Sequence, residues 1–143
     1  MTAANDHLNP FEFSEADTCR EYVTPSIQNA GWGNSPYEIA EQRSFTDGRI
    51  VLSGRTAKRR EGKRADYLLR YRRDLTLAVV EAKPYKTPAG DGLQQAKDYA
   101  EILGLKFAYA TNGREIIEFD FLTGIEQKVD RYPTPDELWQ RQT

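Results

Sequence analysis

Residues 65–83, ADYLLRYRRDLTLAVVEAK, decide the fold of this 143-residue chain. The two halves of the stretch, residues 65–71 and 75–82, are rich in residues that favour β-strands, and Arg72-Arg73-Asp74 separates them. We therefore predict an antiparallel hairpin. Because its second strand is the more apolar one, we expect that strand to lie near the centre of a sheet.

The hairpin pattern also predicts which side chains meet. A turn centred between Arg73 and Asp74 places Asp66 directly opposite Glu81, and residues that lie opposite one another point to the same face with Cβ atoms about 4.5–5.5 Å apart. Strand alternation puts Lys83 on that face too. We expect two carboxylates and one ammonium at the open end of the hairpin.

This combination suits a divalent cation. Opposed like charges on a sheet cost about 0.2–1 kcal/mol unless something lies between them. Two carboxylates and a strand carbonyl are hard oxygen ligands of the kind that Mg²⁺ and Mn²⁺ favour, and Lys83 could then orient or deprotonate an attacking water. The residues alone leave a second interpretation open, in which Asp66 and Glu81 are solvated acids paired with Lys83 and Arg64.

The flanking sequence predicts an α/β domain with a mixed sheet. Ser14 is the expected N-cap of a helix over residues 14–30, with a kink or break near Thr24 because Pro25 follows. Gly104 is the expected C-cap of a helix over residues 91–104. The remaining expected elements are strands at 37–45 and 49–53 around an Asp47-Gly48 turn, strands at 107–111 and 115–121, and a short helix at 136–141.

Composition excludes several classes of site. The chain has one cysteine and one histidine, so an internal disulfide, a CxxC zinc site and a Ser-His-Asp triad are ruled out. The sequence has no apolar run long enough for a membrane span and no signal-peptide pattern, which predicts a soluble, cytoplasmic chain. Its length predicts one domain with one site.

Positive charge is concentrated in one segment. The net charge is -2, but residues 55–64 contain six basic residues and one acidic residue. Such a segment just before Asp66 is expected to contact DNA phosphates, although it can equally be a solvated loop. The residues concerned are Arg55, Lys58, Arg59, Arg60, Lys63 and Arg64.

The sequence resembles a known family at these positions. Asp66, Glu81-Ala82-Lys83 and the helical stretch Gln95-Ala96-Lys97-Asp98-Tyr99 match the PD-(D/E)XK nucleases with a QxxxY motif. More specifically, the chain resembles the N-terminal nuclease domain of the restriction (R) subunit of type I restriction-modification enzymes. The supporting stretches cover nearly the whole chain, and the one departure is Ala65 where the family usually has proline. They are SEADTCREYVTPSIQNAGW, ADYLL, VVEAK, QQAKDYAEILG, FAYATNG and YPTPDELWQR.

The resemblance assigns roles to residues. It implies a restriction-endonuclease-like mixed β-sheet flanked by helices, with metal bound by Asp66, Glu81 and the Ala82 carbonyl, and with Lys83 assisting attack. It places Gln95 and Tyr99 near DNA and the catalytic core, although a tyrosine on a helix flank is often a packing residue. It also suggests that Glu15 points toward the metal from outside its immediate ligands, whereas the sequence alone reads this acid as a helix-dipole partner.

The implied function is Mg²⁺-dependent endonuclease cleavage of duplex DNA, with Mn²⁺ as a substitute. Residues 10–132 would form the core and residues 133–143 the start of a linker. No GxxxxGK[ST] loop occurs in the sequence, so ATP would act only through motor domains outside this chain. Modification and specificity subunits are the implied protein partners. Two alternatives are a stand-alone repair or defence nuclease and a non-catalytic DNA-binding or assembly module.

Overall fold

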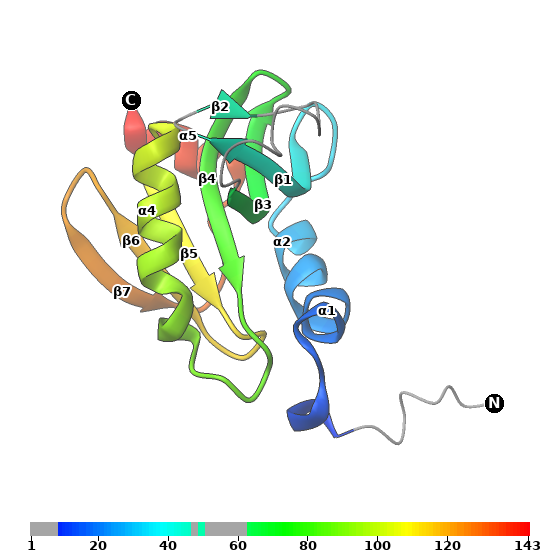
Figure 1. Cartoon of the computed structure of the whole chain (residues 1–143). Helices are drawn as coiled ribbons and strands as arrows, with labels where there is room; N and C mark the ends of the chain where they lie inside the picture. Colours follow the sequence, from blue (N-terminus) through cyan, green and yellow to red (C-terminus); the bar gives the residue numbers. More distant parts are fainter. Residues whose placement is uncertain (1–8, 47–48, 51–62) are drawn as a thin grey trace.

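The computed structural model describes residues 9–46, 49–50 and 63–143. These residues form one sheet of seven strands in the order β2-β1-β3-β4-β5-β6-β7, with helices around it (Figure 1). The strands are β1 (Glu38–Thr46), β2 (Arg49–Ile50), β3 (Lys63–Arg72), β4 (Leu75–Ala82), β5 (Phe107–Thr111), β6 (Ile116–Asp120) and β7 (Ile125–Val129). The helical segments are η2 (Pro10–Glu12), α1 (Glu15–Thr18), η3 (Cys19–Val23), α2 (Thr24–Asn29), η4 (Ala89–Gly92), α4 (Leu93–Leu103) and α5 (Pro135–Gln142).

The sheet is mixed, as predicted. Strands β4 and β5 are parallel and are connected through η4 and α4, whereas every other neighbouring pair in the described sheet is antiparallel. The predicted hairpin is confirmed as β3 and β4. Strand β7 was not predicted, because its residues IEQKV lie at the sheet edge and are almost all exposed, so they show no alternation of apolar and polar side chains.

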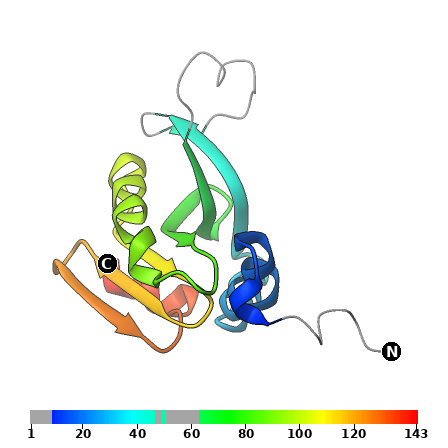
Figure 2. The ribbon, with the colours of Figure 1, turned by 60° about the horizontal axis from the view of Figure 1, so that its bottom comes forward.

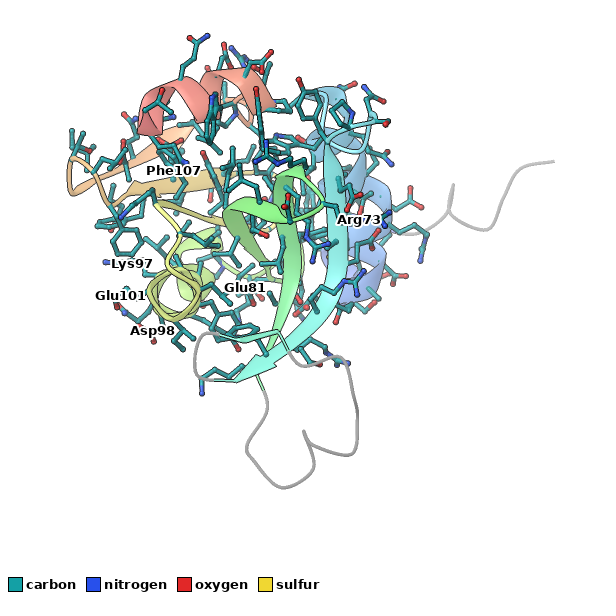
Figure 3. The ribbon with its side chains drawn as sticks, turned by 90° about the horizontal axis from the view of Figure 1, so that it is seen from above. Arg73, Glu81, Lys97, Asp98, Glu101 and Phe107 are labelled. Atoms are coloured by element: carbon teal, nitrogen blue, oxygen red, sulfur yellow. The ribbon has the colours of Figure 1, made fainter. Side chains whose placement is uncertain are left out.

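Two apolar layers enclose the sheet. Helix α4 covers one face, where Ala96 and Ala100 pack with Leu68 and Val79. The N-terminal helices and α5 cover the other face, where Val23, Ile27 and Leu138 pack with Tyr67 and Val80. Figure 3 looks along α4 and shows the sheet between α4 and α5. Figure 2 shows the N-terminal helical segment on the opposite side of the molecule from the β6–β7 hairpin.

The N-terminal helix begins as predicted and changes its winding before Pro25. Ser14 accepts a hydrogen bond from the Asp17 backbone and Asp17 bonds back, which forms a capping box. Residues Cys19–Val23 then adopt a π-helical turn in which the Thr24 amide donates to the Cys19 carbonyl. The helix therefore continues past the proline, which lacks an amide hydrogen, by widening one turn.

The last helix packs on the sheet. The Trp32 ring nitrogen donates to the Pro133 carbonyl over 2.9 Å, Leu138 is fully buried, and Trp139 stacks on Tyr71. Residues 133–143, expected to begin a linker, thus pack against the core here. No helix in the described part of the chain is both long and apolar enough to cross a membrane.

Candidate metal centre

The β3–β4 hairpin brings Asp66 and Glu81 together. Tyr67 and Val80 form the last pair between the two strands, and Asp66 and Glu81 are the next residues toward the open end, as the predicted register requires. The Glu81 Oε2 atom accepts a hydrogen bond from the Asp66 backbone over 2.9 Å, and the Asp66 Oδ2 atom accepts one from the Ala82 backbone over 2.8 Å. Each carboxylate is therefore oriented by the backbone of the opposite strand.

Both carboxylates are buried, and Glu81 is strongly perturbed. Asp66 is 9% exposed and Glu81 is 4% exposed, and Figure 3 shows Glu81 on the face of the sheet that α4 covers. Burial, followed by the charge of Asp66, raises the pKa of Glu81 to about 8. A carboxylate in this position is poorly solvated and faces a like charge, so an added cation would favour its ionised form.

Lys83 lies one alternation beyond Glu81 on the same face. Its backbone donates to the Thr111 carbonyl over 2.9 Å, which extends the parallel pairing of β4 with β5. A Cβ placed on Gly92 would lie 3.5 Å from the Lys83 Cε and 3.8 Å from the Glu81 Cβ, so the start of α4 packs closely on both side chains. The positive charge of Lys83 partly opposes the rise in the Glu81 pKa.

Gln95 and Tyr99 enter the same region from α4. They lie one helical turn apart, and the Gln95 Nε2 donates to the Tyr99 hydroxyl over 2.6 Å. Tyr99 also packs edge-on against Phe45 with ring centroids 4.9 Å apart. Its pKa is raised by burial, with the Glu81 charge acting in the same direction. Tyr99 is thus a packing residue whose hydroxyl is close enough to Glu81 for that charge to affect its pKa.

One pocket of about 330 Å³ gathers these side chains. Glu15 reaches it from α1, and its pKa is raised by burial and then by the Asp66 charge. Lys63 and Arg64 line it from the start of β3, whereas Arg55, Lys58, Arg59 and Arg60 lie outside the described residues. The lining residues are Glu15, Gln42, Lys63, Arg64, Asp66, Glu81, Ala82, Lys83, Gln95 and Tyr99.

Comparison with known proteins identifies relatives of this chain. No protein-family model matches the chain. The type I restriction enzyme EcoAI endonuclease subunit of Escherichia coli is 38% identical over 140 residues, which cover 94% of this chain and 17% of that subunit. A solved fragment described as an HsdR subunit of a type I restriction enzyme from Vibrio vulnificus YJ016 is 57% identical, with a TM-score of 0.80. That match covers 91% of this chain and 25% of the solved chain.

The chain is a homologue of type I restriction enzyme endonuclease subunits. The resemblance to the restriction subunit of type I enzymes and the mixed α/β fold are thereby confirmed, whereas the resemblance to PD-(D/E)XK nucleases stays a prediction. The chain spans only a fraction of either relative, so the activity, substrates and partners of a whole endonuclease subunit are proposals for it.

Gln42 also lines the pocket, but it was not identified from the sequence. Its backbone adopts φ 53°, and the β1–β3 pairing is interrupted at Gln42 and Asp66. The Gln42 Nε2 lies 3.4 Å from the Asp66 Oδ1, the oxygen that Ala82 does not engage. A glutamine at positive φ has no sequence signature, since glycine and asparagine are the residues expected there.

The donor set fits a hard divalent cation with few protein ligands. No cluster of three or more histidine, cysteine, aspartate or glutamate side chains with metal-binding geometry occurs in the described residues. Mg²⁺ does not need one, because it binds through one or two carboxylates and keeps several waters. Glu81 uses one oxygen for the Asp66 amide, and Asp66 uses Oδ2 for the Ala82 amide, while the Asp66 Oδ1 accepts only a long bond of 3.4 Å from Gln42. A cation could therefore still be bound by both carboxylates.

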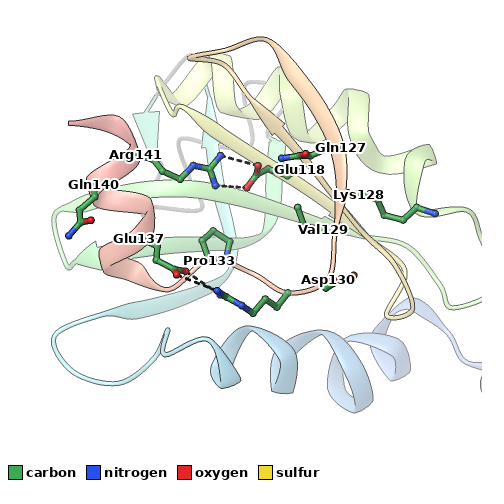
Figure 4. A pocket seen from close by; sticks show the side chains of 10 residues that line it. Glu118, Gln127, Lys128, Val129, Asp130, Pro133, Glu137, Gln140 and Arg141 are labelled. Atoms are coloured by element: carbon green, nitrogen blue, oxygen red, sulfur yellow. Dashed lines mark hydrogen bonds and ion pairs between the residues drawn. The ribbon is translucent and has the colours of Figure 1, made fainter.

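A larger pocket lies elsewhere and lacks this chemistry. It has a volume of about 710 Å³ and lies beside β7 and α5 (Figure 4). Most of its charged side chains are already paired, with Arg141 on Glu118 and Asp120, Arg131 on Glu137, and Lys128 on Glu115. We therefore place the candidate centre of this restriction-subunit homologue in the smaller pocket, where buried like charges face each other.

Proposed function

We propose that this chain is the nuclease module of a type I restriction endonuclease subunit and that it hydrolyses phosphodiester bonds of duplex DNA with Mg²⁺, or Mn²⁺ in its place. The observation that carries the proposal is the opposed, buried pair Asp66 and Glu81 with Lys83 on the same face. The homology to endonuclease subunits of type I restriction enzymes supports the same reaction class.

Each residue has a role in this proposal. Asp66, Glu81 and the Ala82 carbonyl would hold the ion, and Lys83 would orient or deprotonate the attacking water. When bound, the ion supplies positive charge to the scissile phosphate and lowers the pKa of a bound water. Gln95 and Tyr99 would fix the position of the phosphate from the α4 side, and Glu15 would act outside the immediate ligands.

The basic residues before β3 would supply phosphate contacts without sequence choice. Lys63 and Arg64 line the pocket and are the two such residues within the described part of the chain. Recognition of a DNA sequence is proposed to come from modification and specificity subunits. ATP is proposed to act through regions of a full-length subunit that lie outside this chain.

Calorimetric titration of Mn²⁺ tests the metal centre directly. We expect the wild-type chain to bind Mn²⁺ and an Asp66→Ala, Glu81→Ala double variant to lose that binding. An Asp74→Ala, Glu101→Ala double variant is the matched control, because it removes the same charge from exposed positions. Equal binding by all three proteins, or none by the wild type, would contradict the proposed centre.

Cleavage of supercoiled plasmid then tests the reaction itself. We expect Lys83→Ala to abolish cutting while Mn²⁺ still binds, because the lysine acts on water and phosphate rather than on the ion. Metal-independent DNA binding without cutting, unchanged by Lys83→Ala, would instead favour a non-catalytic DNA-binding module.

A further inference from the structure

The segment that follows Lys83 is fixed against two distant parts of the chain. The Tyr85 backbone donates to the Thr18 hydroxyl over 3.0 Å, and the Arg114 Nε donates to the Tyr85 carbonyl over 3.0 Å. Tyr85 is thereby tied to the N-terminal helix on one side and to the β5–β6 turn on the other.

The turn between β5 and β6 is equally well anchored. Asn112 donates from its side chain to the Thr87 carbonyl over 2.7 Å. Gly113 has φ +87°, and a Cβ placed on it would lie 3.0 Å from both the Thr18 Cγ2 and the Tyr22 Cβ. Such close packing leaves the turn little room to move, so the surface it carries is already formed in the free protein.

On this support lies a group of aromatic rings capped by an arginine, which we call the aromatic platform: Phe11, Tyr22, Tyr85 and Arg114. Tyr85 lies 5.1 Å from Phe11 and 5.2 Å from Tyr22 between ring centroids. The Arg114 guanidinium lies 5.1 Å from the Tyr85 ring centroid and 5.5 Å from that of Phe11. One positive charge is thus held over two rings.

The platform is accessible to a ligand. Phe11 is 51% exposed, which is unusual for a phenylalanine in the described residues, and Arg114 is exposed as well. Within the described part of the chain, the side chain of Arg114 uses Nε for its hydrogen bond to Tyr85, which leaves its two terminal nitrogens available to a ligand. A rigid arginine fork beside aromatic rings suits a phosphate next to a sugar or base.

The platform adjoins the candidate metal centre. Lys83 lines the pocket, and Tyr85 follows two residues later in a turn, so at most roughly 7 Å of backbone separates the two residues. Glu15 also lines the pocket, and Thr18, which holds Tyr85, lies three residues further along the same helical segment. One wall of the pocket therefore continues into the platform.

We propose that the aromatic platform binds the DNA strand beside the phosphate held in the pocket, with Arg114 on a neighbouring phosphate and Phe11 and Tyr85 against its sugar or base. This role rests on the proposed nuclease function. The exposed Lys86 adds positive charge, but Glu12 adjoins Phe11, so the platform contacts about one phosphate rather than a long stretch of backbone.

Fluorescence anisotropy with a short labelled DNA duplex, in EDTA so that no cutting occurs, tests the platform. Arg114→Ala is expected to weaken binding by about 3–10-fold and to reduce the dependence of log K on log salt by about one. Phe11→Ala is expected to weaken binding by about 5-fold with an unchanged salt slope, because the ring carries no charge. Arg114→Lys is expected to restore the slope.

Arg73→Ala is the matched control. Arg73 is an arginine whose side chain is 87% exposed, and it lies in the turn at the other end of the β3–β4 hairpin from the pocket. The proposal is overturned if Arg114→Ala keeps the DNA affinity and the salt slope of the wild type. It is also overturned if Arg73→Ala loses as much affinity as Arg114→Ala. The anisotropy measurement contains no metal, so its outcome is independent of the Mn²⁺ titration. A negative result for the aromatic platform would not contradict the metal centre, and a negative Mn²⁺ titration would not contradict the platform.

Discussion

Gln42 combines an unfavourable backbone conformation with a place beside Asp66. A left-handed conformation costs a non-glycine residue roughly 1–2 kcal/mol, and such positions cluster at functional sites. Here φ is 53°, and the side chain reaches the Asp66 Oδ1. Because this backbone conformation reduces stability, the glutamine is better explained by the contact of its side chain with Asp66 than by a contribution to stability.

Replacing Gln42 by glycine tests whether the backbone is strained at this position. We expect Gln42→Gly to leave the free energy of unfolding unchanged or to raise it by up to about 1 kcal/mol, because relief of the left-handed conformation offsets the flexibility of glycine. Gln94→Gly is the control. Gln94 lies in α4, where the same change should cost about 1 kcal/mol. Urea denaturation measures both, and an equal loss at the two positions would argue against strain at Gln42.

Glu81 should make the metal-free protein less stable as pH rises. Its pKa in the folded chain is raised from the ordinary value of 4.5 to about 8, mainly by burial and then by the charge of Asp66. The folded state thus holds the proton more tightly than the unfolded state. This contribution to stability is fully present below about pH 4.5 and is lost as pH rises through about 8.

Glu81→Gln removes this titration and keeps an oxygen for the Asp66 amide. In EDTA, we expect the wild type to lose stability relative to Glu81→Gln between about pH 5 and pH 8.5, with the two similar at the acid end. Urea midpoints measured across this range give the comparison. Parallel pH curves would show that Glu81 does not titrate in this window.

Among the elements, α5 depends on one buried charge network. Arg141 donates two hydrogen bonds to Glu118 (Figure 4) and one to Asp120. The Tyr109 hydroxyl also donates to Glu118. Burial opposes ionisation of Glu118, but the bonds from Arg141 and Tyr109 outweigh it, and the pKa of Glu118 is lowered. Removal of Arg141 would leave a buried carboxylate without its main partner.

Arg141→Leu is therefore expected to reduce the free energy of unfolding by about 2 kcal/mol, a value lowered from that of a fully buried pair because the arginine is partly exposed. Arg131→Leu should cost less than about 1 kcal/mol, since Arg131 and Glu137 form an exposed pair. Urea denaturation of both variants measures the difference. A double variant that combines Arg141→Leu with Glu118→Gln should recover part of the stability lost in Arg141→Leu. If no stability is recovered, the unpaired Glu118 carboxylate is not the cause of the loss.

The elements differ in how far the sequence specifies them. The short turn of the β3–β4 hairpin predicted which residues pair beyond it, although the pairing shifts twice near Arg70. The two shifts cancel, so Tyr67 pairs with Val80 as predicted, and Asp66 and Glu81 follow them. The caps at Ser14 and Gly104 were predictable from residue type. The π-helical turn before Pro25 and strand β7 were not, because both are decided by tertiary contacts and by sheet edges that leave no local pattern.

For the molecule as a whole, the site exists only where several elements converge. Glu15, Gln42, Asp66, Glu81 and Tyr99 come from α1, β1, β3, β4 and α4, yet line one pocket. Local periodicity predicts each element but not their relative placement. The hairpin pair followed from physical reasoning, whereas the proximity of Gln95 and Tyr99 was predicted from the family resemblance alone.

A bound ion should consequently stabilise the whole fold, and more so at alkaline pH. A ligand that binds the folded state only, at a hundred times its Kd, adds about 2.7 kcal/mol, or roughly 5–10 °C in Tm for a chain of this size. Because the pKa of Glu81 is about 8, the ion must displace a proton at lower pH. At one fixed Mn²⁺ concentration, the rise in Tm should therefore be clearly larger at about pH 8.5 than at about pH 6. Differential scanning calorimetry of the wild type and of the Asp66→Ala, Glu81→Ala variant measures it. A pH-independent rise shared by both proteins would place the ion somewhere other than between the hairpin carboxylates.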